Sequence, residues 1–131
     1  MGVELHISRA EHWADNQGLE ISADEWLSYV AADPELQLWS ENGPHFVRWL
    51  GASKYDEPWL DWSQGSVSTK WPDTALFCKM LEIAASLGAN VQDDDGTKYT
   101  AESPWKYDPS ERIAQYAAQP AVPWWKRWLR R

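Results

Sequence analysis

The sequence predicts an α+β fold in which a mostly antiparallel sheet carries two main helices on one face. Several short segments alternate apolar and polar side chains, as half-buried strands do, and two longer segments repeat apolar residues at helical spacing. The chain has 131 residues, 44% of them hydrophobic, which suits one globular core. We therefore expect a single domain over residues 1–103 and a C-terminal extension over residues 104–131, with a short helix and a basic, tryptophan-rich tail.

Alternating side chains bounded by turn residues mark the predicted strands. Residues 3–8 form the first strand, and His6 falls on its polar face. The other predicted strands cover residues 36–38, 45–50, 59–62, 66–71 and 97–100, together with a short strand that begins at Val91. Asp95-Gly96 predicts a hairpin turn before the last strand.

The first predicted helix covers residues 23–32 and has a well-marked start. Ser22 is a good N-cap, and Glu25 three residues later completes a capping box. Ile21 and Trp26 take the two positions of a hydrophobic staple, which places Trp26 in the core. Capping and burial therefore predict the same helix.

The second predicted helix begins after Asp73, its expected N-cap, and ends at Gly88, which suits the left-handed position that closes a helix. Apolar residues recur at helical spacing at Phe77, Met80, Leu81, Ala84 and Leu87. Lys79 is expected on the polar side. Cys78 lies near the edge of the apolar face, so we expect a buried, unreactive thiol, with a reactive one as the alternative.

The chain is acidic, with a formal net charge of −8 and a pI near 4.7, and the charge is unevenly placed. Residues 1–41 hold nine acidic residues and one basic residue, Arg9. An acidic surface repels phosphates, which argues against nucleic-acid binding and favours a basic protein partner. The chain does not start with a signal peptide, and no stretch approaches the ~20 apolar residues of a membrane span, so a cytoplasmic protein is expected.

No pattern in the sequence predicts a catalytic centre or a cofactor. Nucleophile elbows, phosphate-binding glycine loops and dinucleotide fingerprints are absent from it. The single cysteine excludes an internal disulfide and a multi-cysteine zinc site. The spacing of His6, His12 and His45 does not allow any two of them to bind one metal ion from the same helix or strand. We therefore expect no enzyme, metal site or cofactor, with an enzyme built on an unrecognised carboxylate site as an alternative.

Tryptophan is abundant, with eleven residues against two phenylalanines, so much of the core must be built from it. In alternating strands, Trp49 and Trp71 fit the inward face. Trp59 and Trp62 differ in parity within one predicted strand, so one of them should point away from the core. That side chain is a candidate contact residue for a protein or a sugar, and a core role for both is the simpler alternative.

The last eight residues carry four basic residues and three tryptophans. Tryptophan and arginine both favour a membrane interface, but so short a segment holds there weakly. Folding back onto the acidic body, or a disordered segment, is favoured over membrane contact. The candidate contact residues of this tail are Trp124, Trp125, Lys126, Arg127 and Trp128.

A set of short motifs runs from the first predicted strand to the last hairpin. They are Glu4-Leu5-His6-Ile7-Ser8-Arg9, Trp13, Glu20-Ile21-Ser22, Glu25-Trp26-Leu27, Lys70-Trp71-Pro72-Asp73, Met80, Leu87-Gly88-Ala89 and Val91-Gln92-Asp93-Asp94-Asp95-Gly96. This set, which spans roughly residues 3–100, resembles a group of small uncharacterised bacterial proteins. In size, acidity and lack of catalytic motifs, the chain also resembles the immunity proteins of bacterial toxin systems, a resemblance of type that implies no site residues.

Charge, tryptophan content and this resemblance lead to one hypothesis: a cytoplasmic immunity protein that neutralises a basic toxin domain by occluding its active site. The alternative is an adaptor or regulatory domain whose basic tail contacts a membrane or a partner protein. The carboxylates in the loops before and after the first helix are expected to serve only solubility, which leaves them available to a partner. The candidate partner-binding residues are Glu11, Asp15, Glu20, Asp33, Glu35, Trp59 and Trp62.

The loop acids allow a first test once a basic partner is in hand. Replacing Glu11, Asp15 and Glu20 together with Lys should slow association by about tenfold or more at low salt, because charge steering raises the on-rate of oppositely charged proteins. Added salt should also slow the wild-type association. Stopped-flow or biosensor kinetics across a salt series measure both effects. An on-rate indifferent to salt and to the substitutions would place the interface elsewhere, on the hairpin that carries Trp59 and Trp62.

Overall fold

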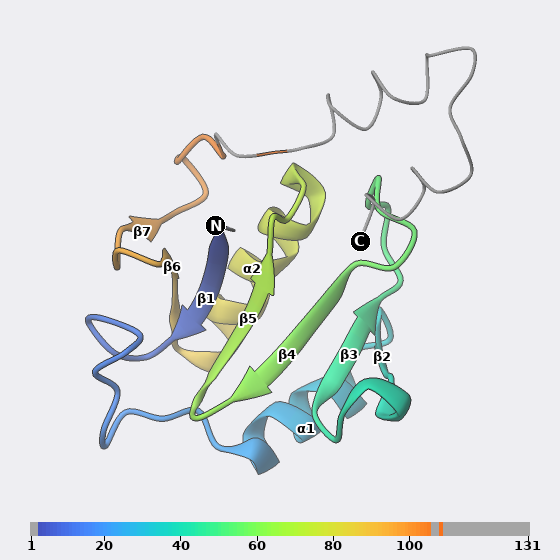
Figure 1. Ribbon diagram of the computed structural model, residues 1–131, viewed down its shortest axis with the longest axis horizontal. Helices are drawn as coiled ribbons and strands as arrows, with labels where there is room; N and C mark the ends of the chain where they lie inside the picture. Colours follow the sequence, from blue (N-terminus) through green and yellow to red (C-terminus); the bar gives the residue numbers. More distant parts are fainter. Residues whose placement is uncertain (1–2, 106–107, 109–131) are drawn as a thin grey trace.

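The computed structural model describes residues 3–105 and residue 108, which form a seven-stranded antiparallel sheet with two α-helices (Figure 1). The elements in chain order are β1 (Glu4–Ser8), α1 (Ala23–Ala32), β2 (Leu36–Leu38), the short 3₁₀ helix η1 (Ser40–Asn42), β3 (Phe46–Trp49), β4 (Trp59–Ser63), β5 (Ser66–Lys70), α2 (Thr74–Leu87), β6 (Asn90–Asp93) and β7 (Lys98–Tyr99). The predicted α+β class is confirmed, and the predicted strands and main helices are present with nearly the predicted bounds.

Strand β1 lies inside the sheet, whose order is β2-β3-β4-β5-β1-β6-β7. It pairs antiparallel with β5, where Val67 is the partner of Ile7, and with β6, where Val91 is the partner of Ile7. The first strand of the chain therefore joins the β2–β5 strands to the β6–β7 hairpin. No local turn signal in the sequence predicts this connection.

Helix α1 begins as the sequence predicts. The Ser22 side chain accepts a hydrogen bond from the Glu25 backbone N–H, and the Glu25 carboxylate accepts one from the Ser22 backbone N–H, which completes the capping box. Ile21 and Trp26, the two staple residues, are fully buried. Trp26 and Val30 form the buried stripe of the helix.

Helix α2 also has the predicted caps. Asp73 accepts a hydrogen bond from the Leu76 backbone N–H, and Gly88 ends the helix at φ = 64°, in the left-handed region. The predicted apolar residues Phe77 and Met80 are buried. The helix therefore covers the sheet with the face that its periodicity indicates.

Two side chains of α2 differ from the prediction. Cys78, expected to be buried, is exposed. It precedes buried Met80 by two positions, which places it about 200° away around the helix, on the opposite side. Lys79, expected on the polar side, is buried, since it lies only about 100° from Met80 at the margin of the same face.

The core fills the space between both helices and one face of the sheet. Residues that pair across the strands point to this face and are fully buried, namely Leu5, Ile7, Val47, Leu60, Val67 and Val91. Trp49 faces the core as predicted and is 8% exposed. Because Trp26 of α1 and Met80 of α2 belong to the same buried cluster, both helices cover one face.

Trp71 does not continue its predicted strand. β5 ends at Lys70, and Trp71 has φ = 47°, in the left-handed region, so the alternation that would turn it inward is interrupted. Its backbone N–H donates to Val3 O at 2.9 Å, and its carbonyl accepts from the Tyr55 hydroxyl at 2.7 Å. The residue is only half-buried.

The opposite side of the sheet, termed the outer face, is covered by neither helix. The strand register places one row of side chains across it, from Phe46 on β3 through Asp61, Ser68 and His6 to Gln92 on β6. The loop that follows β1 lies over the β1–β6 part of this row, and the β3–β4 part carries aromatic residues. The outer face therefore positions both groups of side chains that are candidates for function.

Described residues beyond the predicted domain boundary at residue 103 also contact α2 and its N-terminus. The Trp105 ring stacks on Phe77 with ring centroids 5.2 Å apart, and its indole N–H donates to Pro72 O at 2.7 Å. Asp108 accepts hydrogen bonds from the backbone N–H and the hydroxyl of Thr74. Contacts to α2 thus extend into the predicted C-terminal extension.

The short helix predicted before residue 119 and the tail over residues 124–131 lie outside the described residues. Neither helix in the described part of the chain combines the length and the apolar character that crossing a membrane requires.

Truncating Trp26 should strongly destabilise the fold. The residue is fully buried, and its indole N–H donates to His45 O at 2.9 Å. Trp26→Ala leaves a cavity, so we expect the free energy of unfolding to fall by about 3–5 kcal/mol. Denaturant titration followed by circular dichroism measures this loss. Leu19→Ala, at a residue that is 50% exposed, is the control and should change it by less than about 0.5 kcal/mol. An unchanged midpoint for Trp26→Ala would contradict the burial of this ring.

Candidate functional site

The outer face carries two groups of side chains outside the main core. The aromatic cluster lies over β3, β4 and the end of β2 and consists of Trp39, Phe46, Arg48 and Trp59. The His6 cluster lies on β1, the loop after it and the turn after β6, and consists of Glu4, His6, Trp13 and Asp94. Strand alternation turns the members on β1, β3 and β4 to this side, because the residues between them point into the core.

In the aromatic cluster, three rings and one cation are in contact. Phe46 stacks on Trp59 with ring centroids 5.3 Å apart, and Trp39 meets Phe46 edge to face at 5.8 Å. The Arg48 guanidinium carbon lies 5.0 Å from the centre of the Trp39 ring, a cation–π distance. All four residues are half-buried. The cluster therefore offers accessible aromatic surface that already binds one cation.

Asp61 lies beside the aromatic cluster, opposite Phe46 in the β3–β4 pair. Burial raises the pKa of this carboxyl above its ordinary value, and the nearby His45 offsets the shift only in part. Asp61 forms no salt bridge with any residue of the described chain. A partly desolvated carboxylate without an ion-pair partner favours a cation supplied from outside.

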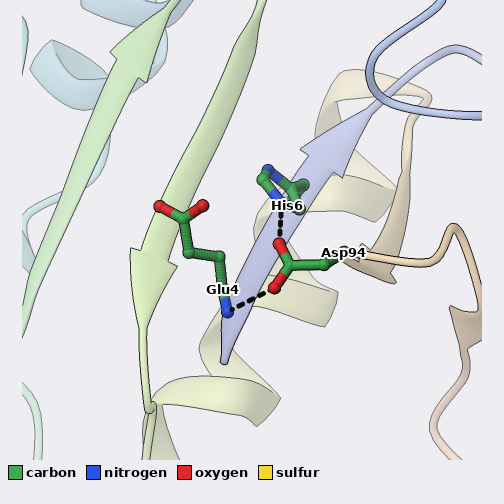
Figure 2. A group of neighbouring side chains, drawn as sticks. All are labelled: Glu4, His6 and Asp94. Atoms are coloured by element: carbon green, nitrogen blue, oxygen red, sulfur yellow. Dashed lines mark hydrogen bonds and ion pairs between the residues drawn. The ribbon is translucent and has the colours of Figure 1, made fainter. Parts of the chain in front are cut away.

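His6 and Asp94 form the centre of the His6 cluster (Figure 2). His6 Nε2 lies 3.0 Å from Asp94 Oδ1, and the Glu4 backbone N–H donates to Asp94 Oδ2 at 3.3 Å. The His6 side chain is 4% exposed, whereas that of Asp94 is 43% exposed. One ring nitrogen of His6 and one carboxylate oxygen each from Glu4 and Asp94 all lie within 4.8 Å of one another. The group thus places a buried imidazole beside two carboxylates, of which that of Asp94 is exposed.

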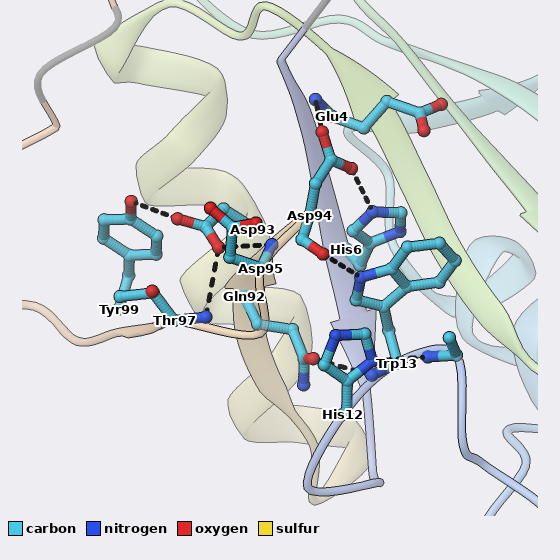
Figure 3. A network of polar contacts seen from close by, with 11 residues as sticks. Glu4, His6, His12, Trp13, Gln92, Asp93, Asp94, Asp95, Thr97 and Tyr99 are labelled. Atoms are coloured by element: carbon cyan, nitrogen blue, oxygen red, sulfur yellow. Dashed lines mark hydrogen bonds and ion pairs between the residues drawn. The ribbon is translucent and has the colours of Figure 1, made fainter.

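The loop after β1 holds the His6 ring in place. Trp13 stacks on His6 with ring centroids 4.0 Å apart and planes 7° from parallel. Its indole N–H donates to Asp94 O at 3.1 Å, and its backbone N–H donates to Gln92 Oε1 at 2.7 Å (Figure 3). Trp13 therefore contacts both the imidazole and the main chain of Asp94, which orients them toward each other.

Asp93 shapes the turn from which Asp94 projects (Figure 3). Its Oδ1 accepts hydrogen bonds from the backbone N–H groups of Asp95 and Thr97, both at 3.0 Å, and its Oδ2 accepts one from the Tyr99 hydroxyl at 2.9 Å. The hairpin predicted at this turn is present between β6 and β7. The Asp93 carboxylate thus stabilises the turn, while the next residue reaches the histidine.

The three predicted contact residues before α1 are exposed on the loop that follows β1: Glu11, Asp15 and Glu20. Glu11 pairs with Lys98 at 2.7 Å, and this hydrogen bond lowers the pKa of Glu11. Asp15 and Glu20 form no salt bridge within residues 3–105 and 108. All three are accessible to a partner, which would have to displace Lys98 to use Glu11.

Asp33 and Glu35, predicted as partner contacts without a structural duty, hold a buried cation. Lys79 Nζ lies 2.8 Å from Asp33 Oδ2 and 2.8 Å from Glu35 Oε1, and it also pairs with Glu82. The expectation that these carboxylates serve only solubility is wrong, because a lysine buried on α2 requires counter-charges.

The pKa values around Lys79 follow from these contacts. Burial by itself would lower the pKa of Lys79, but its hydrogen bonds to three carboxylates raise it above the ordinary value. Burial would raise the pKa of Asp33, but the hydrogen bond from Lys79 and others keep it below its ordinary value. The hydrogen bond from Lys79 likewise lowers the pKa of Glu35. Lys79, Asp33 and Glu35 are therefore all charged at neutral pH.

The two tryptophans of β4 point to opposite sides of the sheet, as their parity predicts. Trp59 turns to the outer face, where it stacks on Phe46. Trp62 packs against the core, and its indole N–H donates to Ile21 O at 2.7 Å. Trp59 is therefore the better placed of the two for contact with a partner. The tail candidates Trp124, Trp125, Lys126, Arg127 and Trp128 lie outside the described residues.

Sequence patterns indicated neither the His6 cluster nor the position of Asp61. The shared parity of Glu4 and His6 on one strand is visible in the sequence. Asp94, however, is 88 positions from His6 in the chain, and only the pairing of β6 with β1 brings it close. Rules that predict metal or catalytic sites from the spacing of residues within one helix or strand cannot detect such a group.

Comparison of the chain with protein-family models, with curated proteins and with solved structures finds no match. The geometry of the outer face is therefore the basis for assigning a function.

Removing a counter-charge of Lys79 should cost most where that counter-charge is itself buried. The Asp33 side chain is 11% exposed, and that of Glu82 is 63% exposed. Asp33→Asn should lower the free energy of unfolding at neutral pH by about 1–3 kcal/mol, since Lys79 is then less well compensated. Glu82→Gln is the matched control, with a loss below about 1 kcal/mol. Denaturant titrations measure both losses, and equal values would show that burial of Asp33 adds nothing to this ion pair.

Proposed function

We propose that this protein is an acidic binding protein that recognises a cationic surface of a partner protein with the outer face of its sheet. The aromatic cluster and Asp61 form the centre of the contact. Binding there occludes the partner's surface, which is how an immunity protein neutralises a toxin whose active site is cationic. We assign this neutralising role, in the cytoplasm, to the chain as part of the proposal.

The observation that supports the proposal most directly is the position of Asp61 beside Phe46 and Trp59. Asp61 is partly buried, and its pKa is raised by that burial. The stacked rings of Phe46 and Trp59 share the outer face with it. A lysine or arginine of a partner that lies over these rings also reaches the carboxylate, so one side chain gains a cation–π contact and an ion pair together.

A contact of this kind already exists within the chain. The Arg48 guanidinium lies over the Trp39 ring at 5.0 Å, and its Nη2 donates to Gln37 Oε1 at 2.6 Å. The rings at this end of the sheet are therefore arranged so that a guanidinium fits against them. Arg48 forms no ion pair with a described carboxylate, whereas a cation bound beside Asp61 would gain one.

The charge of the chain favours the same class of partner. The sequence contains twenty acidic and twelve basic residues, a formal net charge of −8. Such a charge accelerates encounter with a cationic protein, and exposed acids at the rim act mainly on this on-rate. The desolvated aromatic centre acts mainly on the rate of dissociation.

A neutral sugar is the main competitor for an aromatic surface. It would gain nothing from the net charge, and it would leave Asp61 without a counter-charge. These two features favour a cationic protein. The alternative role as an adaptor depends on the tail, which lies outside the described residues.

The proposal predicts that the gene beside this one encodes a basic protein, and the test is to co-express and co-purify the two proteins. Trp59→Ala should weaken binding by about 30-fold or more, since a central aromatic anchor contributes about 2 kcal/mol or more. Asp61→Asn should weaken binding by about tenfold or more, because the partner's cation loses its counter-charge. Titration calorimetry gives both affinities, and thermal unfolding of the free variants shows whether each is folded.

The matched control is Asp24→Asn, which removes an exposed carboxylate from α1 on the other side of the sheet. This variant should bind within about twofold of the wild type, because an isolated exposed charge contributes little. If both outer-face variants bind as tightly as the wild type, or if the neighbouring protein does not bind, the proposed function is wrong.

A further inference from the structure

We propose that Glu4, His6 and Asp94 form a binding site for one divalent transition-metal cation, with Zn²⁺ as the best match. The site shares the outer face with the proposed contact surface but uses none of its residues. It therefore stands or fails independently of the proposed function.

The ligand atoms are already close enough for one metal ion. They lie within 4.8 Å of one another, and His6 Nε2 is 3.0 Å from Asp94 Oδ1. Two ligands that bind the same Zn²⁺ at about 2.0–2.2 Å stand about 3–3.5 Å apart. His6 and Asp94 meet this spacing, so closure of the site requires mainly a rotation of the Glu4 side chain about its own bonds.

The two carboxylates are the second reason to place a cation here. The Glu4 carboxylate forms no hydrogen bond or salt bridge with any described residue, although its oxygen is near that of Asp94. Like charges this close repel each other, and the single hydrogen bond from His6 reaches only one of them. A divalent cation between them neutralises both carboxylates at once.

The donor set favours Zn²⁺ over hard cations. An imidazole nitrogen suits zinc, nickel and copper, whereas Ca²⁺ requires six to eight oxygen ligands and Mg²⁺ retains most of its water. Three protein ligands leave the fourth position of a tetrahedral site for water. That position lies toward solvent, because the Asp94 side chain is 43% exposed.

The surrounding contacts organise the site before metal binds. Trp13 stacks on the His6 ring and donates its indole N–H to Asp94 O. These two contacts fix the position of the His6 ring relative to the turn that carries Asp94. The Asp93 carboxylate fixes the same turn through the N–H groups of Asp95 and Thr97. Such outer contacts are what orient ligands in known metal sites.

Metal binding displaces the proton from His6 Nε2. The neutral ring then carries its one proton on Nδ1, and a ring that was charged releases a proton to solvent. Protons and metal therefore compete for the same nitrogen.

The test is a calorimetric titration of the full, tag-free chain with ZnCl₂ at pH 7.5, after removal of bound metal with a chelator. We expect one Zn²⁺ per chain. Glu4→Gln and Asp94→Asn should each weaken binding by about tenfold or more. Replacing His6 is a poorer test, because it also removes a buried, stacked ring.

His12→Gln is the matched control, since His12 lies on the same loop as Trp13 but outside the ligand group, and it should leave the affinity unchanged. Zn²⁺ should also raise the midpoint of thermal unfolding of the wild type, and do so much less for Glu4→Gln. A purely structural ion pair predicts none of these metal effects. No binding by the wild type up to about 1 mM Zn²⁺, or equal affinity in all variants, would overturn the proposal.

Discussion

The pairing of β1 with both β5 and β6 is the interaction on which the rest of the structure depends. Without it, the β2–β5 strands and the β6–β7 hairpin would be two separate sheets, and a two-stranded hairpin is barely stable alone. The inward residues Leu5 and Ile7 complete the core, while Glu4 and His6 face outward. A one-residue slip in register would exchange these faces, so core and site depend on the same pairing.

Local signals account for the elements that could be predicted. The Ser22 capping box, the Asp73 cap and the left-handed Gly88 act between residues a few positions apart, so the sequence displays them directly. Strand order is different, since it depends on which strands meet after distant parts of the chain approach. Alternation also fails where one residue leaves the extended region, as Trp71 does at φ = 47°.

The same distinction between local and long-range contacts applies to the candidate site. Parity within one strand predicted that a tryptophan of β4 points outward, and Trp59 is that residue. The charge pattern could not show that Asp33 and Glu35 serve a buried lysine, because Lys79 comes from another helix and reads as a surface residue. Acidic side chains acquire a structural or a binding role only through partners that the fold supplies.

The outermost strands of the described sheet are also its shortest, with three residues in β2 and two in β7. A long, bare sheet edge is a template on which another chain can add a strand, and this is a common route to aggregation. Edges this short offer an incoming strand few backbone hydrogen bonds, and Lys98 places a charge on one of them. Both edges of the described sheet therefore limit the addition of a strand from another chain, although the strands between them carry many β-branched and aromatic residues.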